Sequence, residues 1–325
     1  MKIRVPEKNR SVCRDSVKSR AGTADEAESR AMEIAEKMRA CAARVEEAIL
    51  RLTPPETARP AELHRAMRYS LCAGGKRIRP VLILAAAEVF PSANDALPAC
   101  VAIECLHTYT LIHDDLPCMD NSDLRRGRPS CHKQFREDLA LLAGDALNTH
   151  AFALLAEAYA GTPEIAVALI RELGDAAGSR RLIGGQVEDT IGERGALTPE
   201  RLDYIHANKT AALLEAALAM GFILGARGND AEVLKKAHEI GFCTGIAFQI
   251  VDDLLDLTSD AGTLGKPVHA DADNGKLTYP ALHGIEKSRE RAAELTARAL
   301  ELCDSLGGGN AFLRGVIASL LSRKK

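Results

Sequence analysis

Long stretches of helical periodicity constrain the fold of this chain more than any other feature. From residue 23 onward, Ala, Leu and Glu recur with apolar side chains at helical spacing, and short breaks rich in Gly, Pro, Asn or Asp separate the stretches. Strand-like alternation of Val, Ile or Thr with hairpin signals is not found. The sequence therefore predicts an all-α fold. The expected helices lie at 23–52, 61–72, 80–89, 96–116, 136–160, 163–178, 199–225, 230–257 and 287–305.

The composition after residue 60 does not shift, so the chain is expected to form a single domain of roughly ten helices, covering residues 23–325. The stretch 211–225 is apolar almost all round, which indicates burial inside a bundle or at a subunit interface and favours a homodimer. The first twenty residues carry seven Lys or Arg against two acids. They could be a transit segment, an extended start or a disordered tail, and the two acids favour a tail at 1–22.

Composition indicates which ligands and which cellular location this chain can be expected to have. The net charge is −3, aromatic residues make up 4% and Trp is absent, which argues against nucleic-acid binding. The nine cysteines form no CxxC pair, which fits free thiols in a reducing cytoplasm. No apolar run reaches the 18 or so residues that span a bilayer, so no transmembrane segment is expected.

A cluster of carboxylates stands in the stretch "LIHDDLPCMDNSDLRRGRP", residues 111–129. Asp114 and Asp115 follow an apolar helical run, and Pro117 disfavours continuation of that helix. The two acids are therefore expected at a helix C-terminus, where the helix dipole is already negative. A solvated helix end is the plain alternative for one such pair. Otherwise the cluster, which includes Asp120, calls for a cation.

A second cluster, in "FQIVDDLLDL", supplies Asp252, Asp253 and Asp256. Their spacing of three and four residues places them on one side of a helix. Two carboxylates about 6 Å apart repel by roughly 3 kcal/mol at an effective dielectric of 20. Because oxygen ligands without His or thiolate indicate Mg²⁺ with substrate phosphates, the sequence predicts several Mg²⁺ ions, with Mn²⁺ possible, and a phosphorylated ligand.

Basic groups that could hold phosphate oxygens recur along the chain. Arg forks and Lys amines bind such oxygens, although each of these residues taken singly could be a surface charge. The spacing GxxxxGK[ST] is absent, so a nucleotide-binding P-loop is not indicated. The candidates are Lys76, Arg77, Arg79, Arg125, Arg126, Arg128, Lys209, Lys266 and Lys276.

The motifs "GGKRIRP", "LIHDDLPCMDNSDLRRGRP", "LAGDAL", "GGQVED", "NKTAALLEAA", "FQIVDDLLD", "TLGKP" and "DNGKLTYP" occur in one order between about residues 60 and 285. In this the chain resembles the short-chain trans-prenyl diphosphate synthases, which include the farnesyl and geranylgeranyl diphosphate synthases, and among them the bacterial farnesyl type. The resemblance implies a dimeric bundle of mostly antiparallel helices around a central cavity, with both Asp motifs at its mouth. It also implies Mg²⁺-dependent ionisation of an allylic diphosphate, attack by isopentenyl diphosphate and loss of a proton.

The resemblance also implies roles for individual residues. Asp114 and Asp120 are the preferred direct ligands of the first motif, and Asp252 of the second. Thr210 and Gln249 would turn their dipoles to the carbocation, while Gln186 could equally be a packing residue. His107 could be a packed helix histidine, but the resemblance favours a diphosphate contact. The metal set is Asp114, Asp115, Asp120, Asp252, Asp253 and Asp256; the isopentenyl diphosphate set is Lys76, Arg79, His107 and Arg126; the allylic diphosphate set is Arg125, Lys209 and Lys266.

Product length is expected to depend on Tyr109, which lies five residues, or about 7.5 Å along a helix, before Asp114. Thr110, the next residue, is the second residue expected to influence chain length. A tyrosine there can form the floor of the cavity, because packed cores do not yield a ring's volume cheaply. In the resembled family, an aromatic here, with the two extra residues between Asp115 and Asp120, accompanies a fifteen-carbon product. Farnesyl diphosphate is therefore expected, with geranylgeranyl diphosphate as the alternative if the floor lies deeper.

Two other classes of protein share part of this motif pattern. A class I terpene cyclase also combines an Asp-rich motif with Mg²⁺, but "GGKRIRP" and "VDDLLD" argue against it. A regulatory subunit that resembles a synthase without catalysing the reaction would usually lack one of the Asp motifs, and this chain keeps both. Turnover by the protein alone would separate an enzyme from such a subunit.

Overall fold

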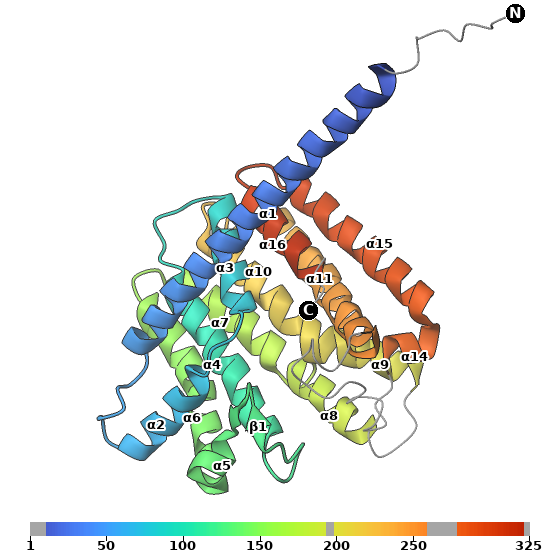
Figure 1. The fold of residues 1–325 in the computed structure, drawn as a ribbon. Coiled ribbons are helices and arrows are strands. Elements are labelled where there is room, and N and C mark those ends of the chain that lie inside the picture. The colour runs from blue at the N-terminus through green and yellow to red at the C-terminus, as the bar shows by residue number, and fades with distance from the viewer. Residues whose placement is uncertain (1–10, 193–197, 259–277, 322–325) are drawn as a thin grey trace, which may run out of the picture.

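The computed structural model describes residues 11–192, 198–258 and 278–321 as a bundle of helices, which confirms the all-α expectation. Figure 1 shows α1 running across the bundle with its N-terminal part projecting beyond it. The helices are α1 Ser11–Leu52, α2 Ala61–Leu71, α3 Ile78–Val89, α4 Leu97–Asp114, α5 Cys131–Phe135, α6 Glu137–Ala158, α7 Pro163–Ala177, α8 Leu182–Gly192, α9 Pro199–Ile205, the π-helix η1 His206–Ala211, α10 Ala212–Leu224, α11 Ala231–Thr258, α14 Tyr279–His283, α15 Ile285–Asp304 and α16 Ala311–Leu321.

Several helices begin where the local chemistry predicts it. Asp230 Oδ1 accepts hydrogen bonds from the backbone N–H groups of Glu232 and Val233, which otherwise lack partners within α11. Thr198 caps α9 in the same way, and Pro199 follows it at the first helical position. These caps fix the starts of α11 and of α9, which continues into the π-helix η1.

Helix α10 is the centre of the core and packs against α3, α7 and α11. All thirteen of its residues are buried within this one chain. Glycine permits the closest approaches: a Cβ on Gly221 would lie 2.5 Å from the carbonyl oxygen of Ile83, and one on Gly241 would lie 2.5 Å from Glu215 Cα. The apolar stretch 211–225 is therefore accounted for inside the chain, and it no longer supports a subunit interface.

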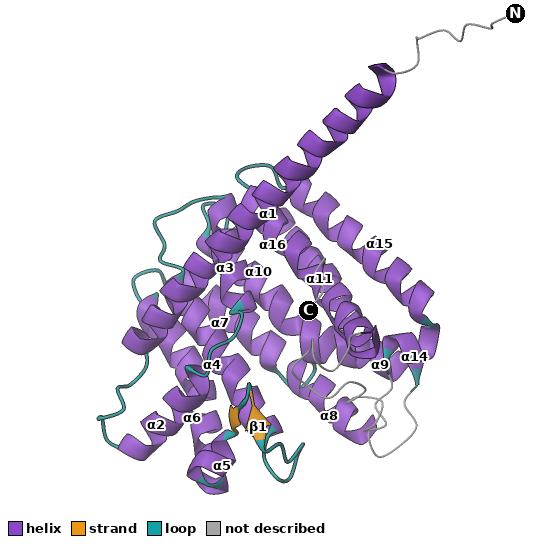
Figure 2. Cartoon of the chain, viewed as in Figure 1, coloured by secondary structure: helices purple, strands orange, loops and turns teal. Residues whose placement is uncertain are grey.

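The structure departs from the expected elements at several places. Helix α1 begins at Ser11, before the start expected at residue 23, while residues 1–10 lie outside the described part. Helices α8 and α16 were not expected. One short hairpin was not expected: β1 Leu124–Arg125 and β2 Arg128–Pro129 pair antiparallel, in orange in Figure 2.

Arg126 and Gly127 form the turn of this hairpin, with φ of 53° and 74°. Positive φ at both central residues matches the twist of a two-residue hairpin. The usual sequence signal for this turn is Asn-Gly or Asp-Gly. Arg-Gly does not give that signal, so the hairpin escaped detection.

Among the described residues, two helical stretches are long and apolar enough to cross a membrane by length and composition alone. Pro199–Leu224 is 78% buried over its most apolar 18 residues, so other helices of this chain cover most of its apolar surface. Helix α6 is only 39% buried over its window. It leaves Leu141 and Leu142 exposed.

Candidate active site

The first aspartate motif begins where α4 ends, as the sequence predicts. Asp114 is the last helical residue, and its carbonyl oxygen accepts a hydrogen bond from the backbone N–H of Asp120 over 2.9 Å. Burial raises the pKa of Asp114 to about 6, and the negative charges of Asp120 and Asp115 add to this. The positive charges of Lys209 and Arg125 act in the opposite direction. The charged form of Asp114 is therefore unfavourable at this position unless another cation binds beside it.

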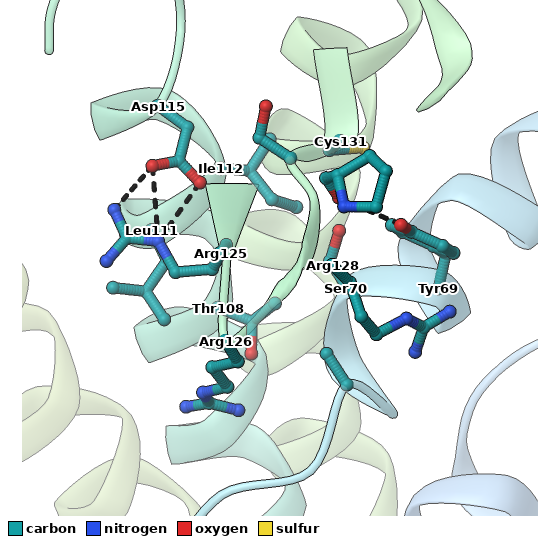
Figure 3. A pocket seen from close by; sticks show the side chains of 13 residues that line it. Tyr69, Ser70, Thr108, Leu111, Ile112, Asp115, Arg125, Arg126, Arg128 and Cys131 are labelled. Carbon is teal, nitrogen blue, oxygen red and sulfur yellow. Dashed lines mark hydrogen bonds and ion pairs between the residues drawn. The ribbon is translucent and has the colours of Figure 1, made fainter. Parts of the chain in front are cut away.

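Asp115 has a different environment, although it is the next residue. Its side chain is 3% exposed and forms an ion pair with Arg125 of β1. Arg125 Nε lies 3.1 Å from both carboxylate oxygens, and Nη2 also donates to Oδ1, as the dashed lines in Figure 3 show. The structure thus joins a residue expected to bind metal to a residue expected to bind the allylic diphosphate.

Three of the residues expected to hold isopentenyl diphosphate influence one another in the structure. Burial, with the charges of Arg79 and Arg126 next in size, holds the pKa of His107 well below its usual value, so the imidazole is neutral at neutral pH. Burial also lowers the pKa of Arg79, whose Nε has no hydrogen-bond partner among the described residues. Arg126 donates from Nη1 to the carbonyl oxygen of Gly74. Lys76 is exposed.

Arg77 is a structural residue, although the sequence made it a candidate phosphate ligand. Its guanidinium lies 2.7 Å from Glu46, 2.6 Å from Glu104 and 2.6 Å from the carbonyl oxygen of Leu71. These contacts hold a left-handed backbone conformation with φ of 48° immediately before α3. Arg77 therefore ties the chain between α2 and α3 to α1 and α4, and this helps to place Arg79.

A cavity of about 700 Å³ lies between α4, α6, α8 and η1. Its volume falls in the range of small-molecule sites, and its lining combines apolar side chains, several of them from α8, with polar and charged groups. Tyr109 is 8% exposed and packs edge to face against His113, with ring centres 5.5 Å apart. The lining includes the predicted site residues Arg79, His107, Tyr109, Thr110, Asp114, Gln186, Lys209 and Thr210.

Lys209 and Thr210 lie in the π-helix η1, a rare local form that is frequent at functional sites. The Lys209 amine is 2.5 Å from a carboxylate oxygen of Asp189 on α8. Glycines allow the neighbouring helices to approach η1. A Cβ on Gly185 of α8 would lie 2.4 Å from Lys209 N, and one on Gly245 of α11 would lie 2.5 Å from Ala211 Cα. The π-helix is therefore held between two helix backbones.

The three acids of the second motif do not share one environment, as their spacing suggested they would. Asp253 is 5% exposed. It accepts hydrogen bonds over 2.9 Å from Gln249 Nε2 and over 2.9 Å from the backbone N–H of Tyr279. Asp252 and Asp256 on the same helix are only partly buried. The expected phosphate ligands Lys266 and Lys276 lie outside the described residues.

No group of three or more His, Cys, Asp or Glu side chains close enough to hold a metal ion occurs within residues 11–192, 198–258 and 278–321. Among the described residues the first motif is the candidate metal site, because the negative charge of Asp120 adds to the cost of ionising the buried Asp114. Carboxylate oxygens suit Mg²⁺, which commonly takes one or two carboxylates and completes its shell with substrate phosphates and water. The donor type at Asp114 and Asp120 therefore fits this ion.

Sequence reasoning missed several residues of the site. Asp189 pairs with Lys209, and Asp145 and Asn148 line the cavity from α6. For Asp189 a signal was present, because it stands three residues after Gln186 in "GGQVED" and so shares a helix face with it. For Asp145 the signal was the motif "LAGDAL", to which the sequence analysis assigned no role.

Comparison with known proteins agrees with this geometry. The family model described as polyprenyl synthetase matches residues 60–303. Geranylgeranyl pyrophosphate synthase 7, chloroplastic, of Arabidopsis thaliana is 50% identical over 246 residues, which cover 74% of this chain and 70% of that protein. The heterodimeric geranylgeranyl pyrophosphate synthase large subunit 1, chloroplastic, of the same plant is 49% identical over 247 residues, 74% of this chain and 66% of that protein.

A solved structure has the same fold. The geranyltransferase from Helicobacter pylori, complexed with magnesium and isoprenyl diphosphate, has a TM-score of 0.75 and 34% identity, and the match covers 88% of this chain and 95% of that one. The expected cytoplasmic location is contradicted, because both Arabidopsis relatives are chloroplastic by name. Free cysteines indicate a reducing compartment without distinguishing one such compartment from another. The chain belongs to the polyprenyl synthetase family and is a prenyltransferase.

Proposed function

We propose that this chain is a geranylgeranyl diphosphate synthase, which joins isopentenyl diphosphate to allylic diphosphates in the presence of Mg²⁺. The observation that carries the reaction type is the cavity of about 700 Å³, which Asp114, Lys209, Arg79 and His107 line together with apolar residues of α8. Such a cavity can hold charged diphosphates beside polar residues and an isoprenoid chain among apolar ones. The twenty-carbon product is supported by relatives named geranylgeranyl pyrophosphate synthases.

The chain's own residues divide the work of binding. Asp114 and Asp120, with Asp252 and Asp256 of the second motif, would hold Mg²⁺ against the allylic diphosphate. Lys209 lies on the cavity wall, where its positive charge can meet the same diphosphate. Bound Mg²⁺ would stabilise the diphosphate as a leaving group, so that the C–O bond breaks with its electron pair on oxygen.

Isopentenyl diphosphate would bind at Arg79 and Arg126, beside the neutral imidazole of His107. Burial lowers the pKa of both arginines, as expected for cations that await an anion. The double bond of isopentenyl diphosphate then forms the new C–C bond with the allylic cation. The proton lost from the adjacent carbon passes to the released diphosphate.

Farnesyl diphosphate is the second candidate product, and Tyr109 is the observation that favours it. The Tyr109 ring lines the cavity and is almost fully buried against His113. If this ring closes the cavity, growth stops at fifteen carbons. The names of the relatives weigh against that outcome.

The test is incubation of the purified chain and Mg²⁺ with radiolabelled isopentenyl diphosphate and, separately, dimethylallyl, geranyl or farnesyl diphosphate. The products are dephosphorylated and their chain lengths measured. We expect mainly the twenty-carbon alcohol from each starter. A mainly fifteen-carbon alcohol would make the chain a farnesyl diphosphate synthase, and no product from a folded chain would favour a regulatory subunit. Asp114→Asn is the inactive control, and parallel assays with Mn²⁺ compare the two metals.

A homodimer belongs to the same proposal, on a ground different from the sequence expectation. Helix α6 leaves the side chains of Leu141 and Leu142 46% and 54% exposed. Adjacent exposed leucines favour a protein contact. Light scattering after size exclusion should give twice the mass of one chain, whereas Leu141→Glu with Leu142→Glu should give a monomer.

A further inference from the structure

Three hydrogen bonds link the cavity wall to the second aspartate motif. Thr210 Oγ1 donates to Gln249 Oε1 over 3.0 Å, and Gln249 Nε2 donates to Asp253 Oδ1 over 2.9 Å. The other oxygen of Asp253 accepts from the backbone N–H of Tyr279 over 2.9 Å. The link therefore runs from η1 across α11 to the first residue of α14.

The chemistry of these groups fixes the direction of the link. A carboxylate only accepts hydrogen bonds, so the end of the Gln249 amide that faces Asp253 must be the NH₂ group. The carbonyl oxygen of Gln249 then faces Thr210, and the hydroxyl must give it its only proton. Because Thr210 lines the cavity, the lone pairs of its oxygen are what the hydroxyl can offer to a ligand there.

If the hydrogen bond between Thr210 and Gln249 ran in the opposite direction, the effect of Thr210 on a positive charge in the cavity would be reversed. If the Gln249 amide were reversed, its NH₂ group would donate to Thr210, and the hydroxyl proton would be free to turn toward the cavity. A proton there repels a developing positive charge, whereas lone pairs stabilise it. The orientation of one buried amide therefore decides the sign of the dipole that the cavity presents.

We propose that Asp253 is a positioning residue that fixes the hydrogen bond from Thr210 to Gln249, so that oxygen lone pairs of Thr210 face the reacting carbon. This inference rests on the proposed function, since only a reaction through a positive carbon benefits from it. Asp253 suits this role because it is 5% exposed and both its oxygens accept hydrogen bonds. His206 Nε2 lies 3.7 Å from the second oxygen.

Asparagine cannot replace this carboxylate, although it has nearly the same shape. Two donors, Gln249 Nε2 and the Tyr279 N–H, point at Asp253 from different sides. An asparagine at this position offers one oxygen and one NH₂ group, so one of the two donors would face another donor. Reversing the Gln249 amide removes that conflict between two donors. The NH₂ group of Gln249 then donates to Thr210, and the hydroxyl proton of Thr210 can turn toward the cavity.

The first experiment measures the kinetics of Asp253→Asn in the full chain with Mg²⁺. We expect kcat to fall by about 10- to 100-fold, with the KM for isopentenyl diphosphate changed by less than about twofold. Thr244→Val is the matched control on α11, because it removes a buried hydroxyl that has no hydrogen-bond partner among the described residues. Its kinetics should equal those of the unsubstituted chain.

A double-mutant cycle with Thr210→Val distinguishes positioning from a general structural effect. If Asp253 acts through the Thr210 hydroxyl, Asp253→Asn should cost less than about twofold in kcat once that hydroxyl is absent. Independent losses that multiply in the double variant would overturn the proposal. Should Asp253→Asn fail to fold, Gln249→Met tests the same link, with the same expected loss and the same absence of further loss beside Thr210→Val.

Binding of inorganic pyrophosphate with Mg²⁺, measured by calorimetry, separates positioning from metal ligation without any turnover. Asp253→Asn should bind within about twofold of the unsubstituted chain. Weakening by more than about tenfold would make Asp253 a metal ligand and overturn the inference. Absence of any product from the unsubstituted chain would instead refute the proposed function, so the two failures can be told apart.

Discussion

Gly185 is the residue whose substitution tests the site geometry most directly. It lies in α8 under the backbone of η1, and a Cβ at this position would be 2.4 Å from Lys209 N, 2.9 Å from Lys209 Cα and 3.0 Å from the carbonyl carbon of Asn208. All three neighbours are backbone atoms, so no side chain can swing aside to make room. Gly185→Ala must therefore move one helix relative to the other.

The size of the movement follows from the contact distances. Ordinary van der Waals contact begins at 3.4 Å, so the gap to Lys209 N must open by about 1 Å, the difference between 3.4 and 2.4 Å. Such overpacking costs about 1–3 kcal/mol of stability. A displacement of about 1 Å in a catalytic group can lower the rate about 100-fold. Because Arg79 and His107 lie on other helices, the KM for isopentenyl diphosphate should change little.

Steady-state kinetics and urea denaturation of Gly185→Ala, beside the matched variant Gly174→Ala, test this reasoning. A Cβ on Gly174 of α7 would meet only Phe152, at 3.7 Å, which is ordinary contact. Alanine there should keep full activity and add about 0.5–1 kcal/mol of stability, since glycine is a poor helix former. If Gly185→Ala had the same kcat and the same urea denaturation midpoint as the unsubstituted chain, the close contact between α8 and η1 would be refuted.

Three further predictions concern other parts of the chain. Arg77→Met leaves the buried carboxylate of Glu104 without its partner and should cost about 3–5 kcal/mol of unfolding free energy in urea. Tyr109→Ala should leave the twenty-carbon product measured by chromatography unchanged, because that product needs a cavity floor deeper than this ring; a longer product would identify the ring as the floor. His238 has a raised pKa, mainly through its hydrogen bond with Glu172, so it adds stability below its ordinary value of 6.5 that is lost as pH rises through the folded-state pKa. His238→Gln should therefore weaken the dependence of the melting temperature on pH between about pH 6 and 8.

The sequence predicted the helices whose apolar residues recur on one face, and it failed where packing replaces that pattern. Helix α4 was expected to end at the first Asp pair, and it does. Helix α8 was missed because "GGQVED" opens with glycines, which lower helix propensity. Gly185 allows α8 to approach η1 closely, and the local sequence does not reveal this tertiary contact.

Spacing along a helix predicts which residues share a face, but it does not predict what that face meets. Asp252, Asp253 and Asp256 were expected to act together. Asp253 instead turns to Gln249 and the start of α14, because α14 returns to pack on α11 there. The return of a distant segment can convert a candidate ligand into a buried hydrogen-bond acceptor.

The first Asp pair shows the same principle at neighbouring positions. Successive helical residues point about 100° apart, so Asp114 faces the cavity while Asp115 faces the β-hairpin. The hairpin brings Arg125, which balances the charge of Asp115 from within the chain. Asp114 keeps a pKa raised to about 6 because burial outweighs the opposing charges around it. The fold thus neutralises one carboxylate of the pair and leaves the other to the Mg²⁺ and diphosphate of the proposed reaction.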